Sequence, residues 1–204
     1  MDKSTHYISS EQLTLAGVRE ALQQKLALSE DAQQRIVHCR TYLDEKLAKE
    51  DTPIYGINTG FGSLCDQEID KKDLAKLQSN LVQSHACGLG DEVPSEIVQL
   101  MLFLKIQSLA YGHSGVALET VQRLIDFYNQ EVYPVVYQLG SLGASGDLAP
   151  LAHLALPLLG LGEVRFQGKV RPASEVMAQF GWQPIELQSK EGLALLNGTQ
   201  FMSA

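Results

Sequence analysis

The chain has 204 residues, of which 45% are hydrophobic and 20% are charged, as is usual for a globular protein with a buried core. Its formal net charge of −8, with no basic stripe, argues against binding to nucleic acid or to an anionic membrane surface. The N-terminus lacks the apolar segment of a secretion signal, and Cys39, Cys65 and Cys87 lack metal or redox spacing. We therefore expect free thiols and a cytoplasmic protein.

Helical patterns dominate the first part of the chain. Residues 13–24 form a short amphipathic segment, and residues 31–49 place apolar side chains on one helical face. Residues 51–65 are rich in Gly, Asn and Thr, which predicts a loop. Further helices are predicted over residues 70–86, 94–111 and 116–130, each bounded by glycine or proline.

The second part begins with a strongly apolar segment, residues 148–159, which predicts a buried helix with Asp147 at its N-cap. This segment is too short to span a bilayer. Residues 163–171 alternate around a Gln-Gly turn and predict a small hairpin. Short helical segments follow at residues 173–180 and 187–197. The expected fold class is therefore mainly α with a small β-hairpin.

The histidines outside the motifs described below lack metal-ligand spacing, so we expect no metal site. We expect His6 to be disordered and His38 to lie on a solvated helix. His153 lies among leucines, which favours a hydrogen-bonded core histidine.

An Ala-Ser-Gly tripeptide, Ala144 to Gly146, lies in a glycine-rich stretch directly before the apolar segment. In a tight turn the Gly146 nitrogen can attack the Ala144 carbonyl carbon, because glycine has no Cβ to obstruct the approach. One water leaves on ring closure and a second takes the Ser145 hydroxyl. The product is a five-membered ring with an exocyclic methylene, an electrophile that ordinary side chains lack.

Other interpretations of this loop fit the sequence less well. A phosphate cradle before a helix would need a G-x-x-x-x-G-K-[ST] or G-x-G-x-x-G order, and Asp147 would repel an anion. A hydrolase nucleophile would need G-x-S-x-G, which is also missing. The tripeptide alone favours a flexible connector before a buried helix.

Four motifs, taken together, favour a reactive loop over a flexible connector. They are residues 55–62 (YGINTGFG), 78–88 (QSNLVQSHACG), 143–152 (GASGDLAPLA) and 190–199 (KEGLALLNGT). In this order they resemble the aromatic amino acid ammonia-lyase family, and within it the histidine ammonia-lyases most closely. The resemblance covers nearly the whole chain. It implies that residues 1–204 form an N-terminal domain of the fumarase/aspartase type, with the C-terminal helical bundle absent from this chain.

The resemblance also implies an activity, the non-oxidative deamination of L-histidine to trans-urocanate and ammonia. It implies a 4-methylidene-imidazol-5-one ring built from Ala144, Ser145 and Gly146, with no external cofactor. Tyr55 matches the family tyrosine that removes the Cβ proton of the substrate. Asn197 matches the asparagine that contacts the ring and the amine region of the substrate.

Substrate binding is expected at Ser84, His85 and Gly62. The Ser84-His85 pair resembles family members that act on histidine, because an imidazole needs a polar partner and an unpaired buried histidine would reject an apolar ring. Alternatives stay open: a packed tyrosine at position 55, a simple turn at Asn197, and a helix-terminal role for His85. At the level of the whole protein, a tyrosine or phenylalanine ammonia-lyase, an aminomutase or a non-catalytic folded domain also stays open.

The family resemblance further implies a homotetramer whose active sites combine residues from several subunits. A second tyrosine, an arginine and a glutamate of the family site are expected outside residues 1–204. This chain alone is therefore expected to have little or no activity, and its partners are expected to be an amino acid substrate and further copies of the complete protein.

Overall fold

The computed structural model describes residues 4–49, 52–62, 66–140 and 143–204. Its architecture is mainly α, with short strands at the edges, as the sequence predicts. The expected free thiols at Cys39 and Cys87 are present, and Cys65 lies outside the described residues.

The elements follow one another along the chain. They are β1 (Thr5–Ile8), α1 (Leu15–Ala21), β2 (Lys25–Leu28), α2 (Glu30–Lys49), the 3-10 helix η2 (Lys71–Asp73), α3 (Leu74–His85), β3 (Leu89–Glu92), α4 (Ser95–Ala110), α5 (Leu118–Asn129), β4 (Tyr133–Pro134), β5 (Tyr137–Leu139), α6 (Leu148–Ala155), the 3-10 helix η3 (Leu156–Leu159), β6 (Glu163–Phe166), β7 (Lys169–Pro172), α7 (Ala173–Gln179), α8 (Glu191–Leu196) and α9 (Gln200–Ser203).

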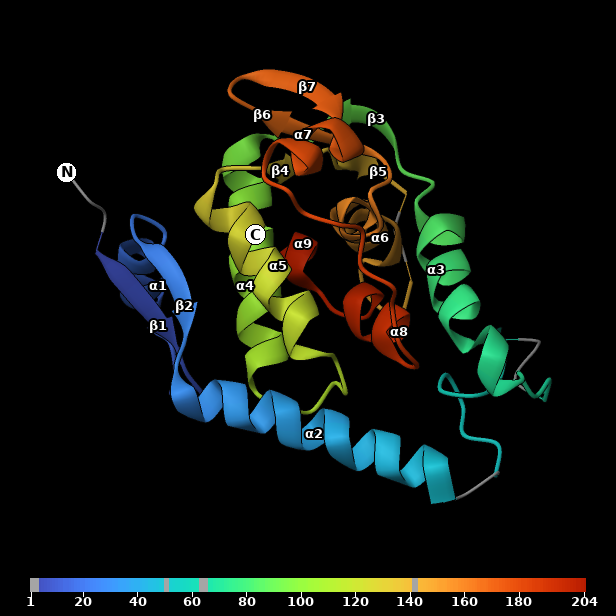
Figure 1. The fold of residues 1–204 in the computed structure, drawn as a ribbon. Coiled ribbons are helices and arrows are strands. Elements are labelled where there is room, and N and C mark those ends of the chain that lie inside the picture. The colour runs from blue at the N-terminus through green and yellow to red at the C-terminus, as the bar shows by residue number, and fades with distance from the viewer. Residues whose placement is uncertain (1–3, 50–51, 63–65, 141–142) are drawn as a thin grey trace.

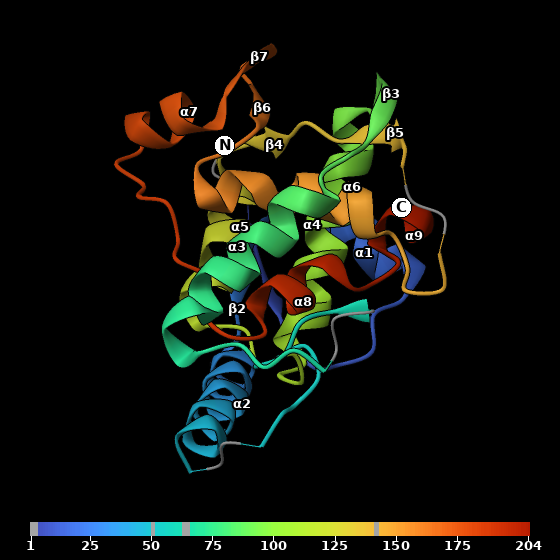
Figure 2. The ribbon, with the colours of Figure 1, turned by 90° about the vertical axis from the view of Figure 1, so that its right-hand side faces the viewer.

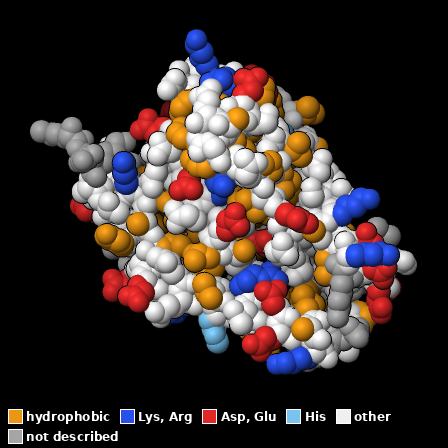
Figure 3. Space-filling view, in the orientation of Figure 1, with side chains coloured by type: hydrophobic (Ala, Val, Ile, Leu, Met, Phe, Trp, Pro, Cys, Tyr) orange, Lys and Arg blue, Asp and Glu red, His pale blue; other side chains and the backbone are white. Residues whose placement is uncertain are grey.

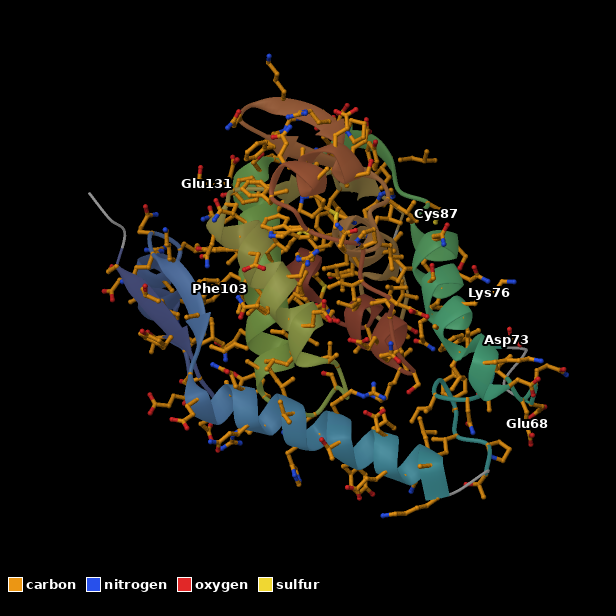
Figure 4. The ribbon with its side chains drawn as sticks, in the orientation of Figure 1. Glu68, Asp73, Lys76, Cys87, Phe103 and Glu131 are labelled. Atoms are coloured by element: carbon orange, nitrogen blue, oxygen red, sulfur yellow. The ribbon has the colours of Figure 1, made fainter. Side chains whose placement is uncertain are left out.

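Helix α4 is the centre of the molecule. Its sequence is apolar on almost every side, which is typical of a helix surrounded by other elements. Helix α5 packs along it, and α2 lies across one end of both helices (Figure 1). The β1–β2 pair covers the side of α4 and α5 away from α3, where Phe103 of α4 meets the ring of His6 (Figure 4).

Helices α3, α6 and α8 pack against one another and form a second group beside α4. Seen from that side, α3 and α8 face the viewer (Figure 2). This group carries the residues of all four motifs or contacts them directly, so it positions the candidate site.

The strands form three small sheets. Strands β1 and β2 are parallel, β3 and β5 are antiparallel, and β4, β6 and β7 form an antiparallel sheet in the order β4-β6-β7. The hairpin predicted at residues 163–171 is confirmed as β6 and β7, which pair from Glu163 with Pro172 to Phe166 with Lys169.

Two expectations need correction. His6 is not disordered: it lies in β1, opposite Leu26 of β2. The side-chain amide of Asn129 both accepts from Leu26 N and donates to Leu26 O, at 2.8 Å each, and so anchors the pair to α5. The helix predicted over residues 148–159 ends at Ala155 and continues as a 3-10 turn, because Pro157 has no N–H for an α-helical hydrogen bond.

Acidic and basic side chains are interspersed with apolar ones on the face shown in Figure 3. No helix in the described part of the chain combines the length and the apolar character needed to cross a membrane.

Candidate active site

The Ala-Ser-Gly loop forms a tight turn. The Gly146 amide donates to the Gly143 carbonyl at 3.2 Å, and Ala144 and Ser145 occupy the exposed corner. Gly146 has φ +93° and forms an isolated parallel bridge with Gly198. A Cβ at position 146 would overlap the Gly198 carbonyl oxygen. Only glycine therefore fits both this backbone conformation and this contact.

Asp147 holds the other side of the loop. It occupies the N-cap position of α6, as predicted, but its side chain makes no capping hydrogen bond. Its backbone amide donates to Gly198 O at 2.8 Å, and its carboxylate Oδ2 accepts from the Met202 amide at 2.8 Å. Asp147 thus joins the loop to residues 198–202 rather than capping its own helix.

Asn197 is exposed at the C-terminal end of α8, next to Gly198. Its side-chain amide donates to Leu193 O at 3.0 Å, and its backbone carbonyl accepts from Lys105 Nζ at 2.9 Å. The structure therefore places Asn197 one residue from the segment that contacts Gly146.

Ser84 and His85 end α3. The His85 ring nitrogen Nδ1 lies 2.9 Å from Leu81 O and 3.2 Å from Ser84 Oγ. A carbonyl can only accept, so Nδ1 carries the proton, and in the neutral ring Nε2 is left as an acceptor. The helix-terminal role proposed as an alternative for His85 is thus present, and it leaves the other ring nitrogen able to bind a ligand.

His85 and Ser145 line the same cavity of about 210 Å³. Cys87, which lies just beyond the end of α3 (Figure 4), is also in its wall. The full lining is His85, Cys87, Gly140, Gly143, Ser145, Gly146, Leu148 and Ala149. The structure therefore brings together two residues that are 60 positions apart in the printed sequence.

Tyr55 lies in a turn in which Gly56, Ile57 and Thr59 are buried and Asn58 is half-buried. Its side chain is 58% exposed, its hydroxyl accepts from the Gly62 amide at 3.4 Å, and its ring meets Phe61 edge-on. The buried Thr59 hydroxyl accepts from the Gly56 amide at 3.3 Å and closes the turn. Tyr55, Gly62, Ser84 and Asn197 do not line the cavity shared by His85 and Ser145.

Two contacts fix the end of α3 against the loop. Strand β3 pairs Leu89 with Leu139 of β5, directly before the glycine-rich stretch. The Gly88 amide donates to His153 Nε2 at 3.0 Å, so His153 is hydrogen-bonded as predicted. Burial lowers the pKa of His153, which favours the neutral ring that this acceptor role requires.

The sequence interpretation missed Lys105. This side chain of α4 is 1% exposed and donates to Ala194 O and Asn197 O, at 3.2 and 2.9 Å. Burial lowers its pKa to about 7. The available indication was a single lysine within the apolar run LMLFLKI at residues 100–106, since a lysine is seldom fully buried without partners. Across the described ranges, no three His, Cys, Asp or Glu side chains are placed to hold a metal ion.

The family model described as "Aromatic amino acid lyase" matches residues 13–204. The chain belongs to this family. It is 53% identical over 181 residues to a histidine ammonia-lyase of Deinococcus radiodurans, covering 89% of this chain and 34% of that protein. The chain thus spans about a third of the length of this relative.

Solved structures agree with this membership. A histidine ammonia-lyase of Trypanosoma cruzi is 36% identical with a TM-score of 0.87, over 98% of this chain and 39% of that one. A tyrosine aminomutase of Streptomyces globisporus is 33% identical with a TM-score of 0.87, over 97% of this chain and 37% of that one. The family prediction and the helical fold class are confirmed.

Proposed function

We propose that the complete protein deaminates L-histidine to trans-urocanate and ammonia without oxidation. The observation that supports this proposal is the cavity that His85 shares with Ser145, since a polar ring able to bind an imidazole and the candidate electrophile would then meet the same substrate. The 53% identity to a histidine ammonia-lyase supports the same substrate.

The turn at Gly143 to Gly146 suits a methylidene-imidazolone ring built from Ala144, Ser145 and Gly146. The glycine at position 146 is held against Gly198 with no space for a side chain, and the exposed Ser145 can lose its hydroxyl. When formed, the ring supplies an electrophilic carbon that captures the substrate, so no external cofactor is required.

The remaining roles are assigned to other residues of the four motifs. The Tyr55 hydroxyl oxygen takes the proton from the substrate Cβ. The Asn197 amide stabilises charge near the ring and the leaving amine. His85 accepts the imidazole N–H of the substrate at Nε2, while Ser84 Oγ, which is 3.2 Å from Nδ1, helps to fix the His85 ring. Gly62 and Ser84 also contact the substrate, and the Gly62 amide donates to the Tyr55 hydroxyl.

The proposal includes an assembly. We propose a cytoplasmic homotetramer in which residues 1–204 form the N-terminal domain and the rest of the protein supplies further site residues. Residues 1–204 alone are then expected to be inactive, and lyase turnover by this chain alone would contradict the proposed division of the site.

The substrate is tested by comparing kcat/KM of the complete protein on histidine, tyrosine and phenylalanine. Histidine is expected to be strongly preferred. A preference for tyrosine or phenylalanine would favour the alternative of a tyrosine or phenylalanine lyase or aminomutase, which the similarity to a tyrosine aminomutase supports. No turnover on any of them, with an unmodified backbone at Ser145 by intact mass, would favour a non-catalytic domain.

The base is tested by Tyr55→Phe. Removal of the hydroxyl is expected to lower kcat by about 10²- to 10⁴-fold, since a positioned base contributes that much. Tyr42→Phe is the matched control, because Tyr42 is a similarly exposed tyrosine on α2, away from the four motifs. Near-normal turnover by Tyr55→Phe would remove this residue from the proposed mechanism.

A further inference from the structure

Lys105 is buried in the middle of α4, yet its ammonium group meets the end of another helix. Its Nζ donates to Ala194 O within α8 and to Asn197 O at the C-cap of that helix. The last carbonyls of a helix have no partner within the helix and carry partial negative charge. A donor at this end therefore satisfies carbonyl groups that have no partner within the helix.

The next residues lead directly to the Ala-Ser-Gly loop. Gly198 follows Asn197, its carbonyl accepts from the Asp147 amide at 2.8 Å, and its backbone forms the bridge with Gly146. Lys105 thus holds the carbonyl of Asn197, and the carbonyl of the next residue, Gly198, accepts from the Ala-Ser-Gly loop.

A second contact from α4 holds the far side of the same segment. Gln200 Nε2 donates to Ser108 Oγ at 3.4 Å, and Ser108 lies three residues after Lys105 on the same face of α4. Gln200 Oε1 is buried without a hydrogen-bond partner, so only the donor end of the Gln200 amide is hydrogen-bonded. Lys105, with two good hydrogen bonds, is the stronger of the two anchors.

We propose that Lys105 is a positioning residue for ring formation. It holds the Asn197 carbonyl, and this keeps Gly198 in close contact with Gly146. This inference rests on the proposed function, because it assumes that Ala144, Ser145 and Gly146 condense. In the step itself the Gly146 nitrogen bonds to the Ala144 carbonyl carbon. The carbonyl oxygen leaves as water with the amide hydrogens of Gly146 and Ser145, and a C=N bond forms between the Ala144 carbonyl carbon and the Ser145 nitrogen. The Ser145 hydroxyl then leaves with the Ser145 Cα proton as a second water. Lys105 takes no part in either bond change.

The test uses the complete protein and the variants Lys105→Met and Lys105→Arg. Methionine fills much of the same apolar channel but has no donor, whereas arginine keeps the charge and several donors. Gln107→Leu is the matched control: Gln107 is a buried polar side chain of the same helix, and its amide donates to Ser9 O at 2.7 Å, away from the loop. It therefore removes a buried side-chain-to-carbonyl hydrogen bond without touching residues 197–198.

The readout is the rate at which newly folded protein becomes lighter by two waters, measured by intact mass, together with thermal unfolding. Lys105→Met is expected to form the ring about tenfold more slowly or worse, which is the effect of losing a hydrogen bond to a charged group. Lys105→Arg is expected to restore most of the rate. Gln107→Leu is expected to form the ring at the wild-type rate, even if its unfolding temperature falls as far as that of Lys105→Met.

Normal ring formation by folded Lys105→Met, or equal slowing in Gln107→Leu, would overturn the proposal. If Lys105→Met does not fold, Lys105→Leu takes its place, since it also has no donor; ring formation at the wild-type rate by folded Lys105→Leu would also overturn the proposal. Failure of the proposed function looks different, because the wild-type protein itself would then keep both waters.

Discussion

Glu191, at the start of α8, anchors the segment that carries Asn197. Its side chain is completely buried. Oε1 accepts from the Ala117 amide at 2.9 Å and from the Thr120 hydroxyl at 2.7 Å, and Oε2 accepts from the Gln188 amide at 2.7 Å. One carboxylate therefore joins the first turn of α5 to the loop before α8.

The variant Glu191→Gln keeps the shape but changes this network. Its oxygen still accepts from Ala117 and Thr120, but as a neutral acceptor it binds about half as strongly. Its new NH₂ group faces the Gln188 amide, donor against donor, so that hydrogen bond is lost. Relief from burying a charge offsets part of the loss. We expect the free energy of unfolding to fall by about 2–4 kcal/mol.

Thr120→Val removes one hydroxyl donor from the same carboxylate and is expected to cost about 1–2 kcal/mol. Because the two side chains share one hydrogen bond, the double variant should cost less than the two single changes together, by about 1 kcal/mol. Urea unfolding of the complete protein at one fixed concentration measures all three, with the exposed Glu186→Gln as control. Additive costs, or a loss below about 0.5 kcal/mol for Glu191→Gln, would refute this account of the network.

Two further predictions concern the loop and its support. Gly146→Ala should prevent ring formation and lower the unfolding temperature, because its Cβ would overlap Gly198 O and its φ is +93°. Gly143→Ala should leave the unfolding temperature nearly unchanged, since its Cβ would have no neighbour within 4 Å. Equal shifts of the unfolding temperature in the two variants, measured by calorimetry, would contradict this prediction. Burial lowers the pKa of His153 below 6.5, so the unfolded state takes up a proton that the folded state resists, and stability should fall as pH decreases through about 6.5. His153→Gln, which can still accept from Gly88, should show a smaller fall between about pH 8 and pH 5.5, and an unchanged pH dependence would exclude His153 as a source.

Much of the helical architecture could be predicted from the sequence. The apolar run of α4 and the glycine and proline boundaries set helix positions to within a few residues, and the Gln167-Gly168 turn located the hairpin. The β1–β2 pair could not be found in this way. These strands have four residues each, are parallel, and are held by Asn129, which lies 103 positions from Leu26 in the chain. No local pattern reports such a contact.

The candidate site also has parts that could be predicted from the sequence and parts that could not. Motif residues predicted the loop, His85 and Asn197 as parts of one site, and the structure places His85 and Ser145 on one cavity. The sequence suggested that Asp147 caps its own helix, but its carboxylate binds the Met202 amide instead. Lys105 was missed because its role depends on backbone carbonyl groups of another helix. Every residue has such a carbonyl, so the sequence does not indicate which of them a lysine will contact.

The motif at residues 190–199 joins the four motifs in the structure, because it contacts each of the other three. Leu193 packs against Gly56 of the first motif, where a Cβ would lie 2.8 Å from Leu193 Cδ2. The Gly192 amide donates to Gln78 Oε1 of the second motif at 3.0 Å. The Gly198 carbonyl accepts from Asp147 of the third.

Helix α8 is only six residues long, so it cannot hold this position by itself. Glu191 fixes its first residue from α5, and Lys105 fixes its last carbonyls from α4. A change at either anchor should therefore disturb the approach of Tyr55, His85 and the loop together rather than one of them alone. A variant at either anchor that slowed ring formation while leaving the turn around Tyr55 and the end of α3 unaltered would show that the motifs are coupled less tightly than these contacts imply.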